Sequence, residues 1–440
     1  MRYFIWTEGC QMNAADSRRL ARSLENLGYE PCAKIDDADV IVLNTCVVRQ
    51  SAEDKAIGRL SSLKSLKREK PQLIINLMGC LVGVHGNPAL QKRFPWVDVF
   101  SAPSDPQPLL DFLTTRLQAG QAEHWRQNID LMLDEEFGVA VAGEQRAVSE
   151  NLPVVLGCSH ACAYCVIPLK RGRERSRDAQ RILRDAATFA AQGVREIVLL
   201  GQIIDRYGLD LPGSPQLPQL LASLSEIPEI KRLRFLTSHP NWMSDELIAS
   251  VAELPKVMPH IEVPIQAGDD GVLLAMRRGY TNQQYRELVA KLRERIPGVS
   301  IATDIIVGFP GETEAAFQKT YDLLADLRLD VAHLARYSPR PGTYSARELP
   351  DDVPAEEKMR RFRLLEDLQE GILRELNETF LGKHVPVLFE HRVKGRWYGR
   401  TPTNRIVFVD SEKDLTGQEY QVKIGWTGPW SLVGSLESSA

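Results

Sequence analysis

Three closely spaced cysteines are the residues of this chain best suited to do chemistry. Cys158, Cys162 and Cys165 stand in the run GCSHACAYCV, a C-x3-C-x2-C pattern that offers a metal centre three thiolates and no fourth. Structural zinc takes four protein ligands, whereas a cubane iron–sulfur cluster held by three cysteines keeps one iron open to a substrate. The pattern therefore predicts a reactive cluster. The alternatives are a zinc site that borrows His160, or three unrelated buried thiols.

Three further cysteines each follow a predicted strand. The apolar runs YFIWT, DVIVLNT and LIINLM are short and bounded, as buried parallel strands are, and they lead to Cys10, Cys46 and Cys80. Because residues just past the carboxyl ends of parallel strands meet in one crevice, these cysteines can converge on a second open-iron cluster. The alternative is that they are ordinary core cysteines. We expect the remaining cysteine, Cys32, to be structural.

Helices must alternate with these strands to make the sheet parallel. Helical patterns lie near 16–27 and 51–68, and the second begins at a possible Ser51 cap with Asp54 three residues on. This alternation predicts an amino-terminal βαβ domain over 1–145. The segment from about 103 to 150 loses strand periodicity and carries the acidic stretch LDEEFG, which places the first domain boundary at about 141–150.

The middle of the chain has the rhythm of a β/α barrel. Six strand-like runs, LPVVLG, EIVLLG, RLRFLTS, HIEVPI, SIATDIIVG and VAHLARYS, alternate with helical stretches such as 180–192, 283–296 and 314–327. Six units rather than eight predict a partial barrel over 146–378 that is open to a large substrate. Active sites of such barrels form where the strands end, and small or polar residues stand there, among them Gln202, Ser238 and Gln266.

The end of the chain changes to an all-β pattern. After a long helical stretch from about 355 to 379, five short β-like runs between 381 and 437 predict a small barrel of the oligonucleotide-binding type over 379–440. Exposed aromatics and cations of such a barrel stack on bases and neutralise phosphates. The candidates are Arg396, Trp397, Tyr398, Arg400, Asn404, Arg405 and Trp426, with core positions as the alternative for the two tryptophans.

Composition limits the classes of partner. The 440 residues are 43% hydrophobic with a net charge of −4, so the chain can bury two or three cores and has no global attraction for nucleic acid. RNA binding must come from local patches, such as KRGRERSR at 170–177 and KMRRFR at 358–363. No GxxxxGK[ST] or GxGxxG motif occurs, which argues against nucleoside triphosphate chemistry.

Location follows from what the sequence lacks. The chain shows no signal peptide and no apolar run long enough to cross a membrane. We therefore expect a reduced cytoplasmic protein without disulfides or membrane contact.

Nearly the whole sequence resembles the methylthiotransferases, a family of radical S-adenosylmethionine enzymes with an amino-terminal auxiliary-cluster domain and a carboxy-terminal TRAM domain. The motifs that carry the resemblance are the cysteine loop with an aromatic before its last cysteine, TEGCQMNAADS, NTCVVRQSAEDK, GCLVG, RGRERSR, TSHP and MRRGY. Within the family they are most similar to members that form 2-methylthio-N6-isopentenyladenosine at position 37 of tRNA, beside the anticodon. GQIID at 201–205 and QAGD at 266–269 depart from the family pattern on the predicted barrel rim.

The resemblance implies two [4Fe-4S] clusters and S-adenosylmethionine as cofactors. One cluster would be the auxiliary cluster on the first three cysteines, and the other the radical-generating cluster on the C-x3-C-x2-C loop. Catalytic residues beyond the cluster ligands are not identified. The remaining implied site residues are, for S-adenosylmethionine, Tyr164, Gln202, Ser238 and Gln266, and for RNA, Arg171, Arg173, Arg175, Arg396, Arg400 and Arg405.

The partners implied are a tRNA anticodon loop that bears isopentenyladenosine and a low-potential electron donor of the flavodoxin or ferredoxin type, and we expect a monomer. Adenine C2 carries an unactivated C–H bond, so a radical must remove its hydrogen, and this chemistry belongs to the cofactor. Three alternatives stay open: methylthiolation of threonylcarbamoyladenosine in tRNA, methylthiolation of a ribosomal-protein aspartate, and a non-catalytic iron–sulfur protein that binds RNA.

Overall fold

A computed structural model describes residues 1–116 and 147–436, which group into two compact units. Unit 1 comprises 1–146, 151–161 and 165–192, and unit 2 comprises 147–150, 162–164 and 193–440. The predicted boundary near 145, its acidic stretch and the last four residues lie outside the described residues. The division into three sequence domains therefore stays a prediction.

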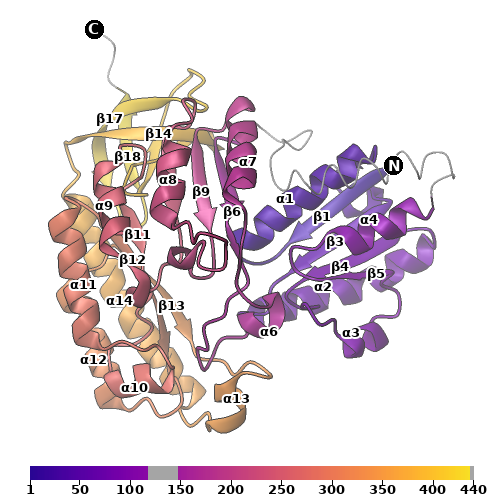
Figure 1. Cartoon of the computed structure of the whole chain (residues 1–440), viewed down its shortest axis with the longest axis horizontal. Helices are drawn as coiled ribbons and strands as arrows, with labels where there is room; N and C mark the ends of the chain where they lie inside the picture. The colour runs from indigo at the N-terminus through magenta and orange to yellow at the C-terminus, as the bar shows by residue number, and fades with distance from the viewer. Residues whose placement is uncertain (117–146, 437–440) are drawn as a thin grey trace. The chain divides into compact units, whose positions relative to one another are not determined.

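Unit 1 is built on a parallel sheet of five strands (Figure 1). Its order is β2-β1-β3-β4-β5, so the chain reverses direction across the sheet between β1 and β3. In open α/β sheets such a reversal opens a crevice at the carboxyl ends of the two strands. The strands are β1 (Arg2–Thr7), β2 (Glu30–Pro31), β3 (Val40–Thr45), β4 (Ile74–Gly79) and β5 (Val99–Ser101).

Helices cover this sheet, and two apolar clusters form its core. The central strands β3 and β4 are buried at every position, as their continuous apolar runs predict. The helices are α1 (Gln11–Asn26), α2 (Gln50–Glu69), α3 (Pro88–Arg93) and α4 (Gln107–Thr114). The expected Ser51 cap is wrong, because α2 begins at Gln50, its N-cap residue is Arg49, and no side chain caps it.

The rest of unit 1 contains both ends of the cysteine loop and two helices. The short strands β7 (Val155–Leu156) and β8 (Arg175–Ser176) pair antiparallel. Between them lies α6 (Ile167–Arg171), and α7 (Ala179–Ala191) follows, capped by the Asp178 carboxylate. The predicted helix at 180–192 is confirmed to within one residue.

Unit 2 contains parallel strands wrapped by helices. One sheet has the order β10-β9-β6 and the other β11-β12-β13, and an isolated bridge between Leu233 and Val257 links β10 to the segment before β11. Five of the six predicted strands are present as β9 to β13, and the first, LPVVLG at 152–157, falls partly on β6 and partly on the separate strand β7. The strands of the two sheets are β6 (Ser149–Pro153), β9 (Glu196–Leu200), β10 (Arg232–Phe235), β11 (His260–Glu262), β12 (Ser300–Val307) and β13 (Val331–Arg336).

The helices of this unit pack on the outer face of its strands (Figure 1). On β12 the alternate side chains Ile301, Thr303 and Ile305 are fully buried. They are α8 (Leu217–Ser225), α9 (Asp245–Glu253), α10 (Asp270–Ala275), α11 (Asn282–Arg295), α12 (Glu314–Leu327), α13 (Tyr344–Glu348) and α14 (Ala355–Glu378). None of the helices in the two described ranges is long and apolar enough to cross a membrane.

Five strands close into a barrel at the end of unit 2, in the order β14-β15-β16-β18-β17. They surround an apolar core that includes Trp397, which is 5% exposed, whereas Trp426 is 54% exposed. The predicted small all-β module is therefore confirmed, and the two tryptophans differ in role. The strands are β14 (His384–Val393), β15 (Arg396–Arg400), β16 (Ile406–Val409), β17 (Glu419–Thr427) and β18 (Leu432–Leu436).

Candidate iron–sulfur and cofactor site

The loops after β1, β3 and β4 carry Cys10, Cys46 and Cys80 at the carboxyl edge of the unit 1 sheet. Cys10 immediately precedes α1 and is exposed, whereas Cys46 and Cys80 are buried. The first two flank the point where the strand order reverses, which is where such sheets bind ligands.

Two glycines allow these loops to approach one another. A Cβ on Gly9 would lie 2.6 Å from Asn13 Oδ1 and 3.0 Å from Cys46 Cβ, and a Cβ on Gly79 would lie 2.5 Å from Thr45 O. Both glycines also have a positive φ, a conformation that other residues rarely adopt. The cysteine-bearing turns therefore have no room for a larger residue at these points.

A buried amide holds the first two loops together. Asn13 Nδ2 donates to Asn44 Oδ1 at 2.9 Å and to Thr45 O at 3.2 Å, and its Oδ1 lies 3.3 Å from Cys10 Sγ as acceptor. Asn44 Nδ2 in turn donates to Asn13 O at 2.9 Å. Asn13, which stands in the TEGCQMNAADS motif, thus links Cys10 to the end of β3.

Arg171 supplies positive charge beside these thiols. Its guanidinium is buried, forms an ion pair with Asp16 at 3.2 Å, and interacts electrostatically with Cys80 and Cys10. Burial raises the pKa of Cys80 to about 11, against the lowering effect of Arg171. Burial also raises the pKa of Cys46. An iron–sulfur cluster would bind these cysteines as thiolates and would therefore bring negative charge. Arg171 lies where its positive charge would balance it.

The three thiols fit a cluster better than a single metal ion. Within the described ranges, no three His, Cys, Asp or Glu side chains are close enough to hold a single metal ion, which gives no support to a zinc site through His160. A cubane cluster is larger than one ion, so its cysteines stand farther apart. Three thiols on adjacent sheet-edge loops, beside a buried cation, fit such a cluster.

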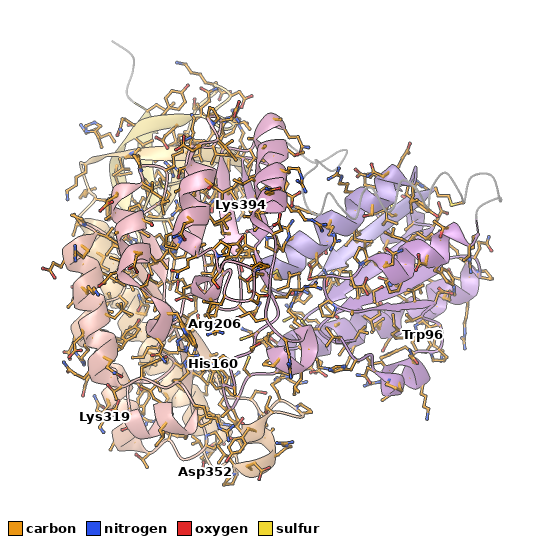
Figure 2. All side chains as sticks on the ribbon, in the orientation of Figure 1. Trp96, His160, Arg206, Lys319, Asp352 and Lys394 are labelled. Atoms are coloured by element: carbon orange, nitrogen blue, oxygen red, sulfur yellow. The ribbon has the colours of Figure 1, made fainter. Side chains whose placement is uncertain are left out.

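The second cysteine group begins in unit 1 at the end of β7. Cys158 is 7% exposed, and its backbone N–H donates to Gly172 O at 3.1 Å. Gly157 precedes it with a φ of +69°, and a Cβ there would lie 2.2 Å from Arg173 O. The basic run after the loop thus folds back along its start. His160, labelled in Figure 2, and the partly buried Cys165 lie in the segment between them.

The middle of the same loop is anchored in unit 2. Ala163 N donates to Met276 O at 3.0 Å, and Ala163 O accepts from Ser345 N at 2.8 Å. Arg278 Nη1 lies 3.2 Å from Cys162 Sγ, and Arg278 Nε donates to Tyr280 OH at 2.8 Å. Each cysteine group therefore has one buried arginine against a thiol.

The residues expected to contact S-adenosylmethionine stand where the strands of unit 2 end. The Tyr164 ring packs edge-on against Phe309 with centroids 6.4 Å apart, and Gln202 is half-buried after β9. Ser238 and Gln266 are 2% and 7% exposed. Among the described residues, neither Ser238 Oγ nor Gln266 Oε1 has a hydrogen-bond partner. Buried polar atoms left in this way fit a polar ligand.

Backbone strain marks the same rim. Gln266 has a φ of +78°, which is uncommon outside glycine, and its N–H donates to Asp304 O at 2.9 Å. A Cβ on Gly268 would lie 2.5 Å from Lys319 O. The departures from the family pattern leave the fold intact here: Asp205 Oδ2 accepts from His239 N at 2.9 Å.

Two carboxylates face the inside of the β11–β13 sheet. Glu262 pairs in register with Ala302, and Asp304 lies two residues further along the same face. The outer face is filled by helices, so both side chains point away from the helices. Burial and the neighbouring Asp304 raise the pKa of Glu262 to about 7. Sequence reasoning missed this pair, although the alternation of SIATDIIV places Asp304 opposite the buried residues.

The six arginines expected to contact RNA divide into two groups. Arg173 and Arg175 are exposed, and Arg396 is half-exposed in an ion pair with Asp410 at 3.2 Å. The other three are held in ion pairs, buried in one case and partly buried in two, and their contact with phosphate stays a prediction. They are Arg171 with Asp16, Arg400 with Glu196 and Glu390, and Arg405 with Asp330.

Comparison with known proteins identifies two family models. Residues 2–102 match "Uncharacterized protein family UPF0004", and residues 152–324 match "Radical SAM superfamily". Two relatives span almost the whole chain and are both named tRNA-2-methylthio-N(6)-dimethylallyladenosine synthase. The protein from Roseiflexus sp. (strain RS-1) is 47% identical over 100% of this chain and 90% of its own length. The one from Chloroflexus aurantiacus is 46% identical over 98% and 91%.

Solved structures show the same fold at low identity. The radical S-adenosylmethionine methyltransferase TsrM from Kitasatospora setae, solved with cobalamin and a [4Fe-4S] cluster, aligns with a TM-score of 0.57 and 13% identity over 90% of this chain and 80% of its own. The cobalamin-dependent enzyme OxsB aligns with a TM-score of 0.50 and 12% identity over 83% and 55%.

Proposed function

The chain belongs to the tRNA-2-methylthio-N(6)-dimethylallyladenosine synthase family, and from this premise we propose that it inserts a methylthio group at C2 of N6-isopentenyladenosine at position 37 of tRNA. It is a radical S-adenosylmethionine methylthiotransferase. The observation that carries the proposal is the relationship at 47% identity over the full length, because it includes both cysteine groups and the segments that position them.

We assign two [4Fe-4S] clusters to the two cysteine groups. Cys10, Cys46 and Cys80 would hold one, and Cys158, Cys162 and Cys165 the other. When bound with S-adenosylmethionine, these groups would supply an electron for a radical able to take the C2 hydrogen and, with a methyl group from a second S-adenosylmethionine, the sulfur for the new bond.

The protein's own part is to position and to shield these groups. Arg171 and Arg278 place positive charge against the cysteines of each group, which stabilises ligand thiolates. Tyr164, Gln202, Ser238 and Gln266 would hold S-adenosylmethionine, with Ser238 Oγ and Gln266 Oε1 providing the polar contacts. A rigid rim of this kind fixes the reacting atoms before the reaction begins.

RNA binding would use the closed barrel, which we assign as a TRAM domain. Its five-stranded closure, the exposed Trp426 and Trp430, and Arg396 support this, because exposed aromatics stack on unpaired bases. Arg173 and Arg175 would contact phosphate beside the cysteine loop. The reaction would take place in the cytoplasm on a monomeric enzyme, with a flavodoxin or ferredoxin as electron donor.

The test is mass spectrometry of nucleosides from the tRNA of a deletion strain that expresses this chain. We expect 2-methylthio-N6-isopentenyladenosine with the wild type, and none with Cys158→Ala or Cys46→Ala, while Cys32→Ala retains activity as a matched control. A different methylthiolated adenosine would contradict the proposed substrate. If methylthiolation survived in Cys158→Ala, the radical assignment would be wrong.

A further inference from the structure

The first turns of α14 carry the basic run KMRRFR, and most of its charge is already neutralised. Three of its four cations pair with carboxylates of unit 2. These are Lys358 with Asp351, Arg360 with Glu314 and Glu357, and Arg361 with Glu312. Among the described residues Arg363 forms no ion pair, and neither does Arg336 at the end of β13; both are exposed.

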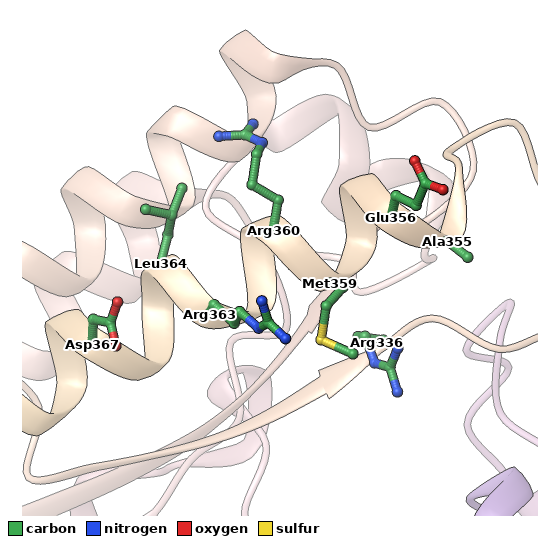
Figure 3. A pocket seen from close by; sticks show the side chains of 8 residues that line it. All are labelled: Arg336, Ala355, Glu356, Met359, Arg360, Arg363, Leu364 and Asp367. Atoms are coloured by element: carbon green, nitrogen blue, oxygen red, sulfur yellow. The ribbon is translucent and has the colours of Figure 1, made fainter.

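Arg336 and Arg363 line one pocket of about 560 Å³ between the end of β13 and α14. Figure 3 shows Met359 between the two guanidinium groups. The two acidic lining residues, Glu356 and Asp367, stand at opposite ends of this stretch of the helix. The pocket therefore presents the two cations Arg336 and Arg363 on either side of an apolar sulfur side chain, besides Arg360, which is held in its ion pairs.

This composition fits a phosphate with its sugar. Two guanidinium groups without carboxylates repel one another, and an oxyanion between them removes that repulsion. Guanidinium matches the oxygens of a phosphate in bidentate fashion, and methionine packs adaptably against a ribose or base. The flanking carboxylates disfavour a further phosphate at either end, so the pocket favours a single backbone position.

The pocket also lies where a bound RNA would pass. Arg336 is the last residue of β13, and the next residue, Tyr337, donates from its N–H to Val307 O at 2.8 Å. The carboxyl ends of barrel strands form the rim that surrounds the active site. A nucleotide whose base enters at this rim must carry its backbone across it.

We propose that Arg336 and Arg363 bind a backbone phosphate of the substrate tRNA next to the modified base, with Met359 against the sugar. This inference rests on the proposed function. An acidic electron-donor protein is the competing occupant. It is less favoured because an acidic protein surface would also meet the carboxylates of Glu356 and Asp367, whereas a single phosphate fits between them.

The test is the affinity of the full-length protein for a fluorescent anticodon stem-loop RNA, measured by anisotropy at several salt concentrations. Arg336→Ala and Arg363→Ala should each weaken binding about 3- to 10-fold and reduce the slope of log affinity against log salt by roughly 1. Arg363→Lys should keep the slope and lose part of the affinity, because lysine keeps the charge but not the bidentate geometry.

Arg374→Ala is the matched control, since Arg374 is an exposed arginine on the same helix with its own partner, Glu370. It should bind RNA as the wild type does. Unchanged affinity and slope in the double variant Arg336→Ala, Arg363→Ala would overturn the proposal. A second outcome would also overturn it: the double variant binds RNA normally and loses methylthiolation with flavodoxin as reductant, but keeps it with dithionite. The pocket would then be the binding site of the electron donor.

The proposed function can fail separately. If the wild type produced no methylthiolated nucleoside and RNA affinity still depended on Arg336 and Arg363, the phosphate site would stand and the substrate assignment would not. Melting temperatures of the two variants, compared with that of Arg374→Ala, separate a binding defect from a folding defect.

Discussion

Two groups of arginines in unit 2 have the same chemistry and opposite surroundings. Under the closed barrel, Arg234 pairs with Glu196 at 2.9 Å, Arg400 pairs with the same carboxylate, and Arg232 pairs with Glu419 at 2.5 Å. At the end of β13, Arg336 and Arg363 have no ion-pair partner among the described residues. A nearby carboxylate thus decides whether a cation holds the fold together or is left for a ligand.

The largest expected effect on stability comes from removing the carboxylate that neutralises the arginines under the barrel. Burial raises the pKa of Glu196, but Arg234 and Arg400 overcome this and lower it to about 2. Glu196→Gln leaves buried cations uncompensated, so we expect a loss of about 3–5 kcal/mol in the free energy of unfolding, measured with urea. A loss below about 1 kcal/mol would show that the arginines find other partners.

The ion pairs of Glu196 also make the stability of the protein depend on pH in acid. Because the native carboxylate has a lower pKa than in the unfolded chain, its stabilisation is present above about pH 4.5 and is lost as pH falls toward 2. The difference in stability between wild type and Glu196→Gln should therefore shrink over that interval.

A second variant tests uncompensated charge of the opposite sign. Glu262 keeps its proton up to about pH 7, so between about pH 4.5 and 7 the native state binds more protons than the unfolded state and stability falls as pH rises. Glu262→Gln does not titrate. Between pH 4 and pH 8, the free energy of unfolding of the variant should rise relative to that of the wild type by up to about 3 kcal/mol. Urea unfolding at each pH measures this difference. A difference in the free energy of unfolding that stays the same at every pH would mean that Glu262 ionises normally.

A smaller effect is expected at the exposed end of the RGRERSR run. Arg173→Ala and Arg175→Ala should each weaken binding of the anticodon stem-loop about 2- to 5-fold, with a shallower salt dependence, because each removes one phosphate contact. Lysine at either position should restore the salt dependence. Equal salt slopes for alanine variants and wild type would exclude these residues from the RNA interface.

The smallest effect is expected where an exposed cation has an exposed partner. Arg374 and Glu370 pair at 2.8 Å across one helical turn, and both are more than 40% exposed. Arg374→Ala should change the free energy of unfolding by about 0.2–0.5 kcal/mol, and 0.5 M salt should remove most of that difference. A change of several kcal/mol would break the comparison, because pairing without burial would then stabilise the fold strongly.

Much of the fold was predictable because its signals are local. The buried strands β3, β4 and β12 are continuous apolar runs, and helix α12 (Glu314–Leu327) begins and ends as its periodicity predicts. The cysteine positions at strand ends follow from the same runs. The five β-like runs at the carboxy end likewise became the closed barrel.

The assignment of charged residues was predictable only in part, because partners distant in sequence decide it. Arg171 stands in a basic run, yet its partner Asp16 lies 155 residues away. Arg400 pairs with Glu196, 204 residues earlier. A charge run in sequence carries no information on such pairing: Arg363 stands in the basic run KMRRFR, whereas Arg336, which lines the same pocket, stands outside it.

The arginines below the closed barrel also limit how the chain can be divided. Arg232 Nη1 donates to Arg400 O at 2.6 Å, and Arg234 donates to Thr401 O and Pro402 O at 2.8 and 2.7 Å. Genetic deletion of the last sixty or so residues would expose these cations and strip Glu196 of a partner. The sequence suggests that the barrel is an independent domain. Recombination could nevertheless move it into another protein only together with the polar residues of β9 and β10 that contact it.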